Sequence, residues 1–149
     1  EKFSAKGAQS VIVWGPGPEN ALHQLDLSWY GVHAVEMLYA LMGTGCEEVT
    51  RTFTPGGDIV TGKWKDGRTG VVQTIKPYGP FGGMIVKDQK VQLGPPDMKS
   101  SYVQLVREIV KFFETKTPPV AEAETLEIFA FMDAAQRSRQ AGGAPAKLR

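Results

Sequence analysis

The first apolar run of the chain has the character of a strand. Val11–Trp14 is β-branched and aromatic, and it stops at Gly15–Pro18, where neither a helix nor a central strand can continue. From about Trp29 to Met42 the apolar residues instead recur at helical spacing, with Gly43 as the terminator, which predicts the first helix. The candidate N-caps are Ser28 and Asp26.

Between Cys46 and Leu93 the pattern changes to short β-prone runs separated by glycine, proline and Asp-Gly signals, which predicts an antiparallel meander. Asp66-Gly67 is the sharpest turn signal, because a type I′ hairpin turn needs positive φ at both central residues and Asp-Gly adopts it readily. Pro55–Gly57 predicts a looser turn. The predicted strands are Val49–Phe53, Ile59–Trp64, Gly70–Ile75, Met84–Val86 and, as a short addition, Lys90–Leu93.

Two further helices are predicted in the last third of the chain. After Gly94–Pro96 a helix begins with Ser101 and Gln104 in capping-box register, and its apolar stripe is ready to cover a sheet. A third helix runs from about Ala121 to Ala141, with acidic residues leading it and arginines ending it, as the helix dipole favours. The stripe of the second helix is Tyr102, Val106, Ile109, Val110 and Phe113, and the inward positions expected in the third are Leu126, Phe129, Ala130 and Met132.

These elements, within 149 residues, indicate a single α+β domain over residues 1–149. A content of 42% hydrophobic and 22% charged residues is ordinary for globular proteins and excludes wholesale disorder. The net charge of +1 is too small for the usual electrostatic footprint of nucleic-acid binding, and no apolar run approaches membrane-spanning length. We therefore expect neither nucleic acid nor a membrane as a partner. The compartment stays open, with the cytoplasm favoured over the periplasm.

Common cofactor and catalytic motifs are missing from the sequence. Gly15–Asn20 follows a strand as a dinucleotide-binding loop would, but Asn20 replaces the third glycine, and Pro16 and Pro18 remove backbone donors that phosphate would need. The single cysteine, Cys46, can form no internal disulfide and has no His or Cys neighbours at zinc-ligand spacing, so we interpret it as a buried apolar residue. We expect this chain alone to bind no cofactor and no metal.

The two histidines are the side chains whose unperturbed pKa values lie near neutrality. His23 falls in a polar loop and is expected to be solvated. His33 shares one face near the helix start with Trp29 and Tyr30. An aromatic pair beside an imidazole suits a sugar, since rings stack on the apolar faces of polyols and a histidine can orient or deprotonate a hydroxyl. The alternative is a partly buried histidine with a capping role.

The segment Tyr30–Leu38 resembles the C-terminal domain of the glucose-fructose oxidoreductase, inositol dehydrogenase and MocA (Gfo/Idh/MocA) family. Gly62–Gly70, and Pro119-Val120 leading to Ala134–Ser138, carry the resemblance over nearly the whole chain. It implies an open, mainly antiparallel β-sheet with helices packed on one face, the other face associating in a homodimer. It also implies an N-terminal Rossmann domain, absent from this chain, that binds NAD or NADP, and a sugar or polyol held between the two domains.

The family commonly carries D-x-G-x-H at this helix, where the carboxylate and the imidazole assist a lysine that the Rossmann half supplies from an E-K-P motif. Gly31 and His33 fit this pattern, which makes His33 the expected catalytic residue. Trp29 stands at the carboxylate position, and Asp26 in the preceding loop is the hypothesised substitute. Trp29, Tyr30 and Asp26 are accordingly the expected substrate-binding residues.

Lys76 and Tyr78, in a loop after a predicted strand, are further candidates for a pocket. Glu1–Phe3 only faintly echoes the lysine motif and lies where the family's catalytic lysine does not occur. A start at glutamate rather than methionine suggests a processed protein or a piece of a longer one.

Three functions remain open from the sequence. The first is the substrate-binding and dimerisation domain of an NAD(P)-dependent oxidoreductase that acts on a sugar or polyol and is incomplete without its Rossmann half. The second is a non-catalytic binding or assembly module that kept the sheet and lost redox activity, as the tryptophan at the carboxylate position would allow. The third is a hydrolase or isomerase built around His33.

Overall fold

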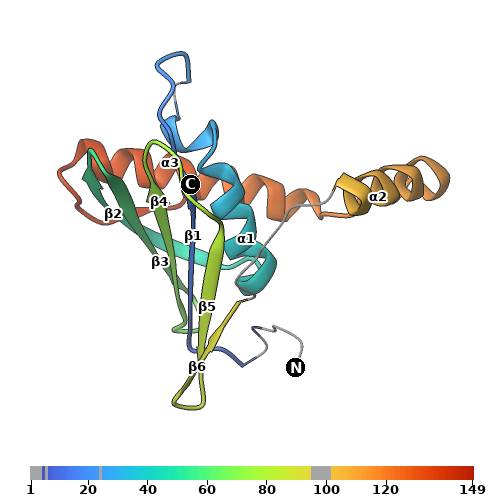
Figure 1. The fold of residues 1–149 in the computed structure, drawn as a ribbon. Helices are drawn as coiled ribbons and strands as arrows, with labels where there is room; N and C mark the ends of the chain where they lie inside the picture. Colours follow the sequence, from blue (N-terminus) through green and yellow to red (C-terminus); the bar gives the residue numbers. More distant parts are fainter. Residues whose placement is uncertain (1–4, 6, 24, 95–101) are drawn as a thin grey trace.

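The computed structural model describes residue 5 and residues 7–23, 25–94 and 102–149. Within these residues the chain forms one open sheet of seven strands in the order β6-β5-β1-β4-β3-β2-β7, with α1 and α3 packed on one face (Figure 1). The predicted α+β class, with a mainly antiparallel sheet and helices on one face, is confirmed. The elements are β1 (Ser10–Pro16), η1 (Asp26–Ser28), α1 (Val32–Met42), β2 (Cys46–Thr54), β3 (Gly57–Trp64), β4 (Thr69–Ile75), β5 (Gly82–Lys87), β6 (Lys90–Leu93), α2 (Tyr102–Thr115), α3 (Glu122–Gln140) and β7 (Ala146–Lys147).

The predicted strands are all present, but they do not form one continuous meander. β2, β3 and β4 are consecutive antiparallel neighbours, and β5 and β6 form a separate hairpin. β1 is inserted between the two groups, parallel to β4 and antiparallel to β5. Its β-branched residues alternate, so that Val11 and Val13 are fully buried while Ile12 and Trp14 lie on the opposite, partly exposed face.

The turns differ in type from the sequence prediction. At Asp66-Gly67 only the glycine has positive φ, 86°, so the turn is present but is not type I′. Positive φ at both central residues occurs instead at Asp88 and Gln89, 49° and 60°, which join β5 to β6. The Pro55–Gly57 turn is tighter than expected, because Gly57 already pairs with the last residue of β2.

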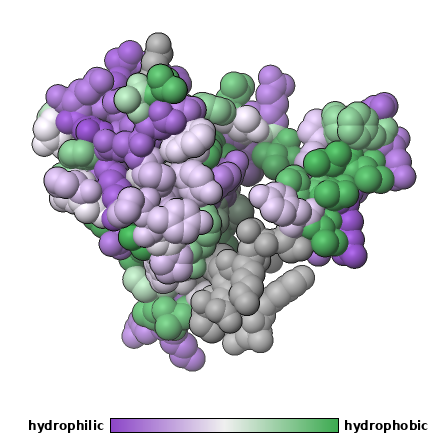
Figure 2. Space-filling model, turned by 45° about the horizontal axis from the view of Figure 1, so that its top comes forward, coloured by the Kyte–Doolittle hydropathy of each residue, from purple (hydrophilic) through white to green (hydrophobic). Residues whose placement is uncertain are grey.

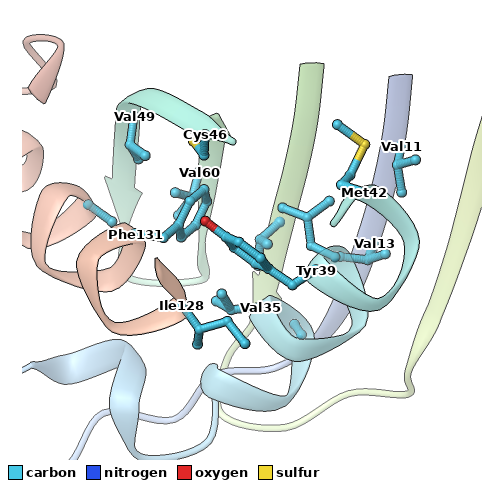
Figure 3. Close-up of a cluster of buried hydrophobic side chains, with 14 of the residues drawn as sticks. Val11, Val13, Val35, Tyr39, Met42, Cys46, Val49, Val60, Ile128 and Phe131 are labelled. Atoms are coloured by element: carbon cyan, nitrogen blue, oxygen red, sulfur yellow. The ribbon is translucent and has the colours of Figure 1, made fainter. Parts of the chain in front are cut away.

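The core lies between the sheet and the two packed helices (Figure 3). The ring of Tyr39 from α1 meets that of Phe131 from α3 edge to face, with centroids 5.9 Å apart. The carboxylate of Glu127 accepts hydrogen bonds from the Tyr39 hydroxyl at 3.1 Å and from the amides of Gly45 and Cys46 at 2.7 and 2.8 Å. α3 is therefore fastened to both α1 and the start of β2.

The first helix begins later than predicted. Asp26–Ser28 forms a short 3-10 turn, and α1 starts at Val32 after Gly31, with no side-chain cap. Neither proposed N-cap serves α1, because the Ser28 hydroxyl donates to the Leu25 carbonyl, just before the 3-10 turn, and Asp26 binds arginines. The predicted terminator is confirmed, since Gly43 has a φ of 68° and its amide donates to the Tyr39 carbonyl at 2.7 Å.

The predicted inward face of α3 is partly wrong. Met132 is buried, whereas Leu126 and Phe129 are exposed. The buried residues follow a stripe offset from the predicted one, because α3 must contact β2 on one side and α1 on the other. They are Ile128, Phe131, Met132, Ala134, Ala135 and Ser138.

α2 departs most from expectation. It forms over Tyr102–Thr115, but none of its residues is buried in the part of the chain that the structure describes. Figure 1 shows it extending away from the sheet, and Figure 2 shows apolar side chains gathered on its surface. The prediction that its stripe covers this sheet is wrong. The capping-box residue Ser101 lies outside the described residues.

Candidate substrate site

Three connections meet at one end of the sheet, beside the start of α1 (Figure 1). The loop after β1 is joined to the end of β4 by a hydrogen bond from the Gly17 amide to the Ile75 carbonyl at 3.0 Å. The amide of the next residue, Lys76, donates a hydrogen bond to the Gly56 carbonyl in the β2–β3 turn at 3.1 Å. The ends of the parallel neighbours β1 and β4 and the turn of the β2–β3 hairpin are therefore joined at this end of the sheet.

An aromatic row runs along this segment. The ring of Tyr30 lies 5.6 Å from the imidazole of His33, 5.9 Å from Tyr78 and 6.3 Å from Trp29, measured between centroids. His23 lies at the far end of the row, away from His33, with its ring tilted against that of Trp29 at 4.9 Å. Tyr30 thus contacts Trp29 and His33, which the sequence grouped with it, and also Tyr78, which the sequence suggested only as a candidate pocket residue. His23, expected to be solvated, contacts Trp29.

The imidazole of His33 has a carboxylate partner on its own helix. Its Nδ1 lies 3.1 Å from Oε2 of Glu36, and both side chains are about half exposed, at 52% and 56%. In the neutral imidazole this contact assigns the proton to Nδ1 and leaves Nε2 with a lone pair, the form that can accept a proton from a hydroxyl. The ring also lies 6.4 Å from Phe81, which closes one side of it.

Asp26 lies in a buried ion-pair network rather than against His33. Its two oxygens accept hydrogen bonds from Arg51 at 2.7 and 2.9 Å, and Arg139 binds the same carboxylate. Arg51, whose side chain is fully buried, also binds Asp58 at 2.8 Å. Its backbone amide donates to the hydroxyl of Ser138 on α3 at 2.9 Å. The network therefore ties the 3-10 turn before α1 to β2, β3 and α3.

The charges of the network hold each other ionised. Burial alone would raise the pKa of Asp26, but the hydrogen bonds and charges of Arg51 and Arg139 outweigh it and keep that pKa below its ordinary value. Burial likewise opposes the charge of Arg51, and its two aspartates raise its pKa in spite of that. The segment leading to His33 is thus anchored by charges that persist at neutral pH.

A hollow of about 490 Å³ opens beside the network. Phe53 forms part of its wall, with Arg139 3.5 Å and Lys76 4.3 Å from the ring centroid. The Lys76 ammonium contacts Glu19 at 2.8 Å and Asp58 at 3.3 Å. Lys76, proposed from sequence as a pocket residue, does line this hollow. The hydrogen bond from Lys76 lowers the pKa of Glu19.

Sequence reasoning missed most of this network, although a signal for it exists. Arg51 lies two residues after the buried Val49 in β2, and Asp58 two residues before the buried Val60 in β3. In a strand, residues two apart share a face, so opposite charges at inward positions of neighbouring strands indicate a buried ion pair.

Among the described residues, no three His, Cys, Asp or Glu side chains are grouped as a metal site, and no helix is long and apolar enough to cross a membrane. Cys46 is buried, as predicted, and burial raises the pKa of its thiol to about 12. The loop after β1 does not fit a nucleotide pyrophosphate, because the Gly17 amide is bonded to Ile75 and Pro16 has no amide hydrogen.

No family model matches the sequence, and a search of curated proteins found no significant relative. Solved structures do share the fold. A putative myo-inositol dehydrogenase from Sinorhizobium meliloti superposes with a TM-score of 0.75 at 12% identity, over 96% of this chain and 57% of its own. GenD2 from gentamicin A biosynthesis, in complex with NAD, has a TM-score of 0.73 at 16% identity, over 99% and 58%.

A third neighbour is the myo-inositol dehydrogenase from Lactobacillus casei in complex with NAD(H) and myo-inositol, with a TM-score of 0.67 at 13% identity, over 96% of this chain and 54% of its own. The chain therefore has the fold of one part of Gfo/Idh/MocA-type dehydrogenases. It spans a little over half the length of the structures it matches.

Proposed function

We propose, from the fold that this chain shares with part of Gfo/Idh/MocA-type dehydrogenases, that it is the substrate-binding and dimerisation domain of an NAD(P)-dependent oxidoreductase acting on a sugar or polyol. The neighbours are dehydrogenases, and two of them were solved with NAD or NAD(H). The described loop after β1 does not fit the nucleotide, so a further domain of the same protein would bind NAD or NADP.

The observation that carries this proposal is the placement of His33. Its imidazole is held by Glu36 on one side and flanked by Tyr30 and Phe81 on others. The rings offer apolar faces on which the C–H groups of a polyol can stack. Nε2 of His33, with its lone pair, is suited to accept the proton of the hydroxyl whose carbon is oxidised.

Glu36 supplies what the usual motif lacks in this sequence. Trp29 occupies the position of the family carboxylate, and Asp26 is already bonded to Arg51 and Arg139. The Glu36 carboxylate, three residues after His33 on the same helix, can orient the imidazole through its contact with Nδ1. Trp29 would then contribute a stacking surface for the ligand.

The open face of the sheet is the proposed dimer interface. Ile12 and Trp14 of β1 and Ile59 of β3 lie on the face opposite the packed helices, with Ile59 40% exposed. Sedimentation of Ile59→Lys should show a loss of dimer, whereas Leu22→Lys, in a loop away from the sheet, should not. A wild-type protein that stays monomeric at high concentration would remove this part of the proposal.

The test of the enzymatic role compares two histidines in the natural full-length protein. Reduction of NAD or NADP is followed with a panel of sugars and cyclic polyols, for the wild type, His33→Gln and His23→Gln. We expect His33→Gln to lower kcat by about 10²- to 10⁴-fold, the usual contribution of a general base, while His23→Gln changes it little. Full activity in His33→Gln, or no nucleotide-dependent turnover in the wild type, would count against the proposal.

A non-catalytic binding module is the second candidate, and Trp29 at the carboxylate position favours it. The intact mass of the natural protein separates the two. A species more than twice the 16.2 kDa of this chain would support a missing nucleotide-binding half. A species of about the same mass that binds polyols without oxidising them would support the module.

A further inference from the structure

Two surfaces of the same domain differ in what covers their apolar residues. α1 and α3 turn their apolar stripes onto the sheet, whereas α2 exposes its stripe along its whole length. Tyr102 and Phe113, at its two ends, are 80% and 64% exposed. The exposed apolar residues between them on the same side of the helix are Leu105, Val106, Ile109, Val110 and Phe112.

The width of this stripe indicates the kind of surface that α2 fits. At 3.6 residues per turn these apolar positions occupy an arc of about 160°, and the opposite side carries Arg107, Glu108 and Lys111. A two-helix coiled coil buries only a narrower seam. An arc of this width fits against the surface of a folded domain, with the mixed charges facing solvent.

The helix also needs such a surface in order to persist. It has 14 residues, and helices of roughly that length are marginal in water without tertiary packing. Within the described residues, its own sheet does not supply that packing, because no residue of α2 is buried.

The comparisons point to where the missing surface lies. The match to GenD2 covers 99% of this chain but only 58% of GenD2, so that protein has a further stretch of chain outside the matched part. A domain formed by such a stretch is the candidate partner for α2.

We propose that the apolar face of α2 docks onto the nucleotide-binding domain of the same polypeptide. This inference rests on the proposed function. α2 then acts as the clamp that fixes the angle between the two domains, and so the distance between His33 and the nucleotide. When the domain is considered without the nucleotide-binding domain, α2 is exposed, which explains why this apolar helix has no buried residue.

The test uses the natural full-length protein and hydrogen exchange read by mass spectrometry over residues 102–115. In the wild type we expect these amides to exchange roughly tenfold or more slowly than in Ile109→Asp, in which a charge is placed at the centre of the apolar face. Lys111→Asp, on the polar face of the same helix, is the matched control and should keep the protection. Exchange in β1 to β4 should be the same in all three proteins, which shows that the domain itself remains folded.

The outcomes separate this inference from the proposed function. Nucleotide-dependent turnover with rapid exchange in α2 would overturn the docking and leave the function standing. Protection that disappears on dilution would assign the face to a second copy of the chain, which also overturns it. Protection that Ile109→Asp removes, in a protein without turnover, would support the docking and count against the oxidoreductase. A natural protein with no additional domain would overturn both.

Discussion

α2 and α3 are consecutive helices along the chain, but only α3 is packed against the sheet in the described part of the chain. α2 has the cleaner separation of apolar and polar sides, and it buries nothing in the described part of the chain. α3 has a more mixed surface, with Leu126 and Phe129 exposed, yet it buries six residues against the sheet and α1. An amphipathic stripe therefore indicates that a helix packs on another surface, but it does not identify that surface.

The difference has a structural cause in the polar contacts that anchor α3. The carboxylate of Glu127 accepts hydrogen bonds from the Tyr39 hydroxyl on α1 and from the amides of Gly45 and Cys46 at the start of β2. The hydroxyl of Ser138, near the end of α3, accepts one from the Arg51 amide. Within α2, by contrast, the Thr115 hydroxyl donates to the Lys111 carbonyl and Lys111 pairs with Glu108, contacts that hold the helix to itself rather than to the sheet. Specific polar contacts, added to the apolar stripe, decide where α3 packs.

The largest expected effect on stability comes from removing the Phe131 ring, at the centre of the contact between α3 and the core. Phe131→Ala removes a fully buried side chain that packs on Tyr39 and Trp64, and should lower the free energy of unfolding by about 3–5 kcal/mol. Urea denaturation followed by tryptophan fluorescence measures it. Phe129→Ala, two residues away on the exposed side, is the matched control and should change stability by about 0.5 kcal/mol or less.

The next effect concerns the network that joins α3 to the entry of α1. Arg51→Met removes the closer of the two cations that contact the buried Asp58 and leaves only Lys76, at 3.3 Å, so it should cost about 3 kcal/mol of unfolding free energy. Adding Asp58→Asn removes the under-compensated charge and should restore part of that loss, so the double variant should be more stable than the sum of the single effects predicts. Strict additivity would mean that the two side chains are not coupled.

Acid should weaken the ion-pair network around Asp26. The pKa values of Glu19 and Asp26 are lowered in the folded protein from ordinary values of 4.5 and 3.8. Their contribution to stability is therefore fully present above those values, and is lost as the pH falls through the folded pKa values. Thermal unfolding should be measured at neutral pH and at pH values below 3.8. Between these conditions the Tm of the wild type should fall, and the Tm of Asp26→Asn should fall less. An unchanged slope in that variant would contradict the assignment.

The smallest effect should come from α2. Phe113→Ala in the chain described here removes an exposed ring, so the free energy of unfolding of the domain should change by about 0.5 kcal/mol or less. The same denaturation experiment used for Phe131→Ala measures it. A loss comparable to that of Phe131→Ala would mean that α2 is packed on this sheet after all, and would erase the contrast between the two helices.

Much of the fold could be predicted because its signals are local. The alternation in β1, the helical spacing before Met42 and the glycine at position 43 each depend on neighbouring residues, and the corresponding elements are present. The turn types were less predictable. Asp66-Gly67 favours positive φ at both residues, but the register between β3 and β4 required it only at the glycine.

The candidate site was predicted in part for the same reason. Trp29, Tyr30 and His33 are neighbours along the chain, so their meeting follows from the start of one helix. The position of Asp26 could not be predicted in this way, since its partners Arg51 and Arg139 come from a distant strand and helix. Only the packed structure shows that the Asp26 carboxylate is already paired with Arg51 and Arg139.

Most of the helices and strands, the α+β class and the aromatic segment around His33 could be derived from the chain alone, because these depend on side-chain periodicity and on the conformations that glycine and proline allow. Only the packed fold shows which apolar stripes are covered, which charges pair, and that β1 enters the sheet between β4 and β5. Those choices depend on contacts between residues far apart along the chain, whose free energies act together only when the elements have been brought side by side.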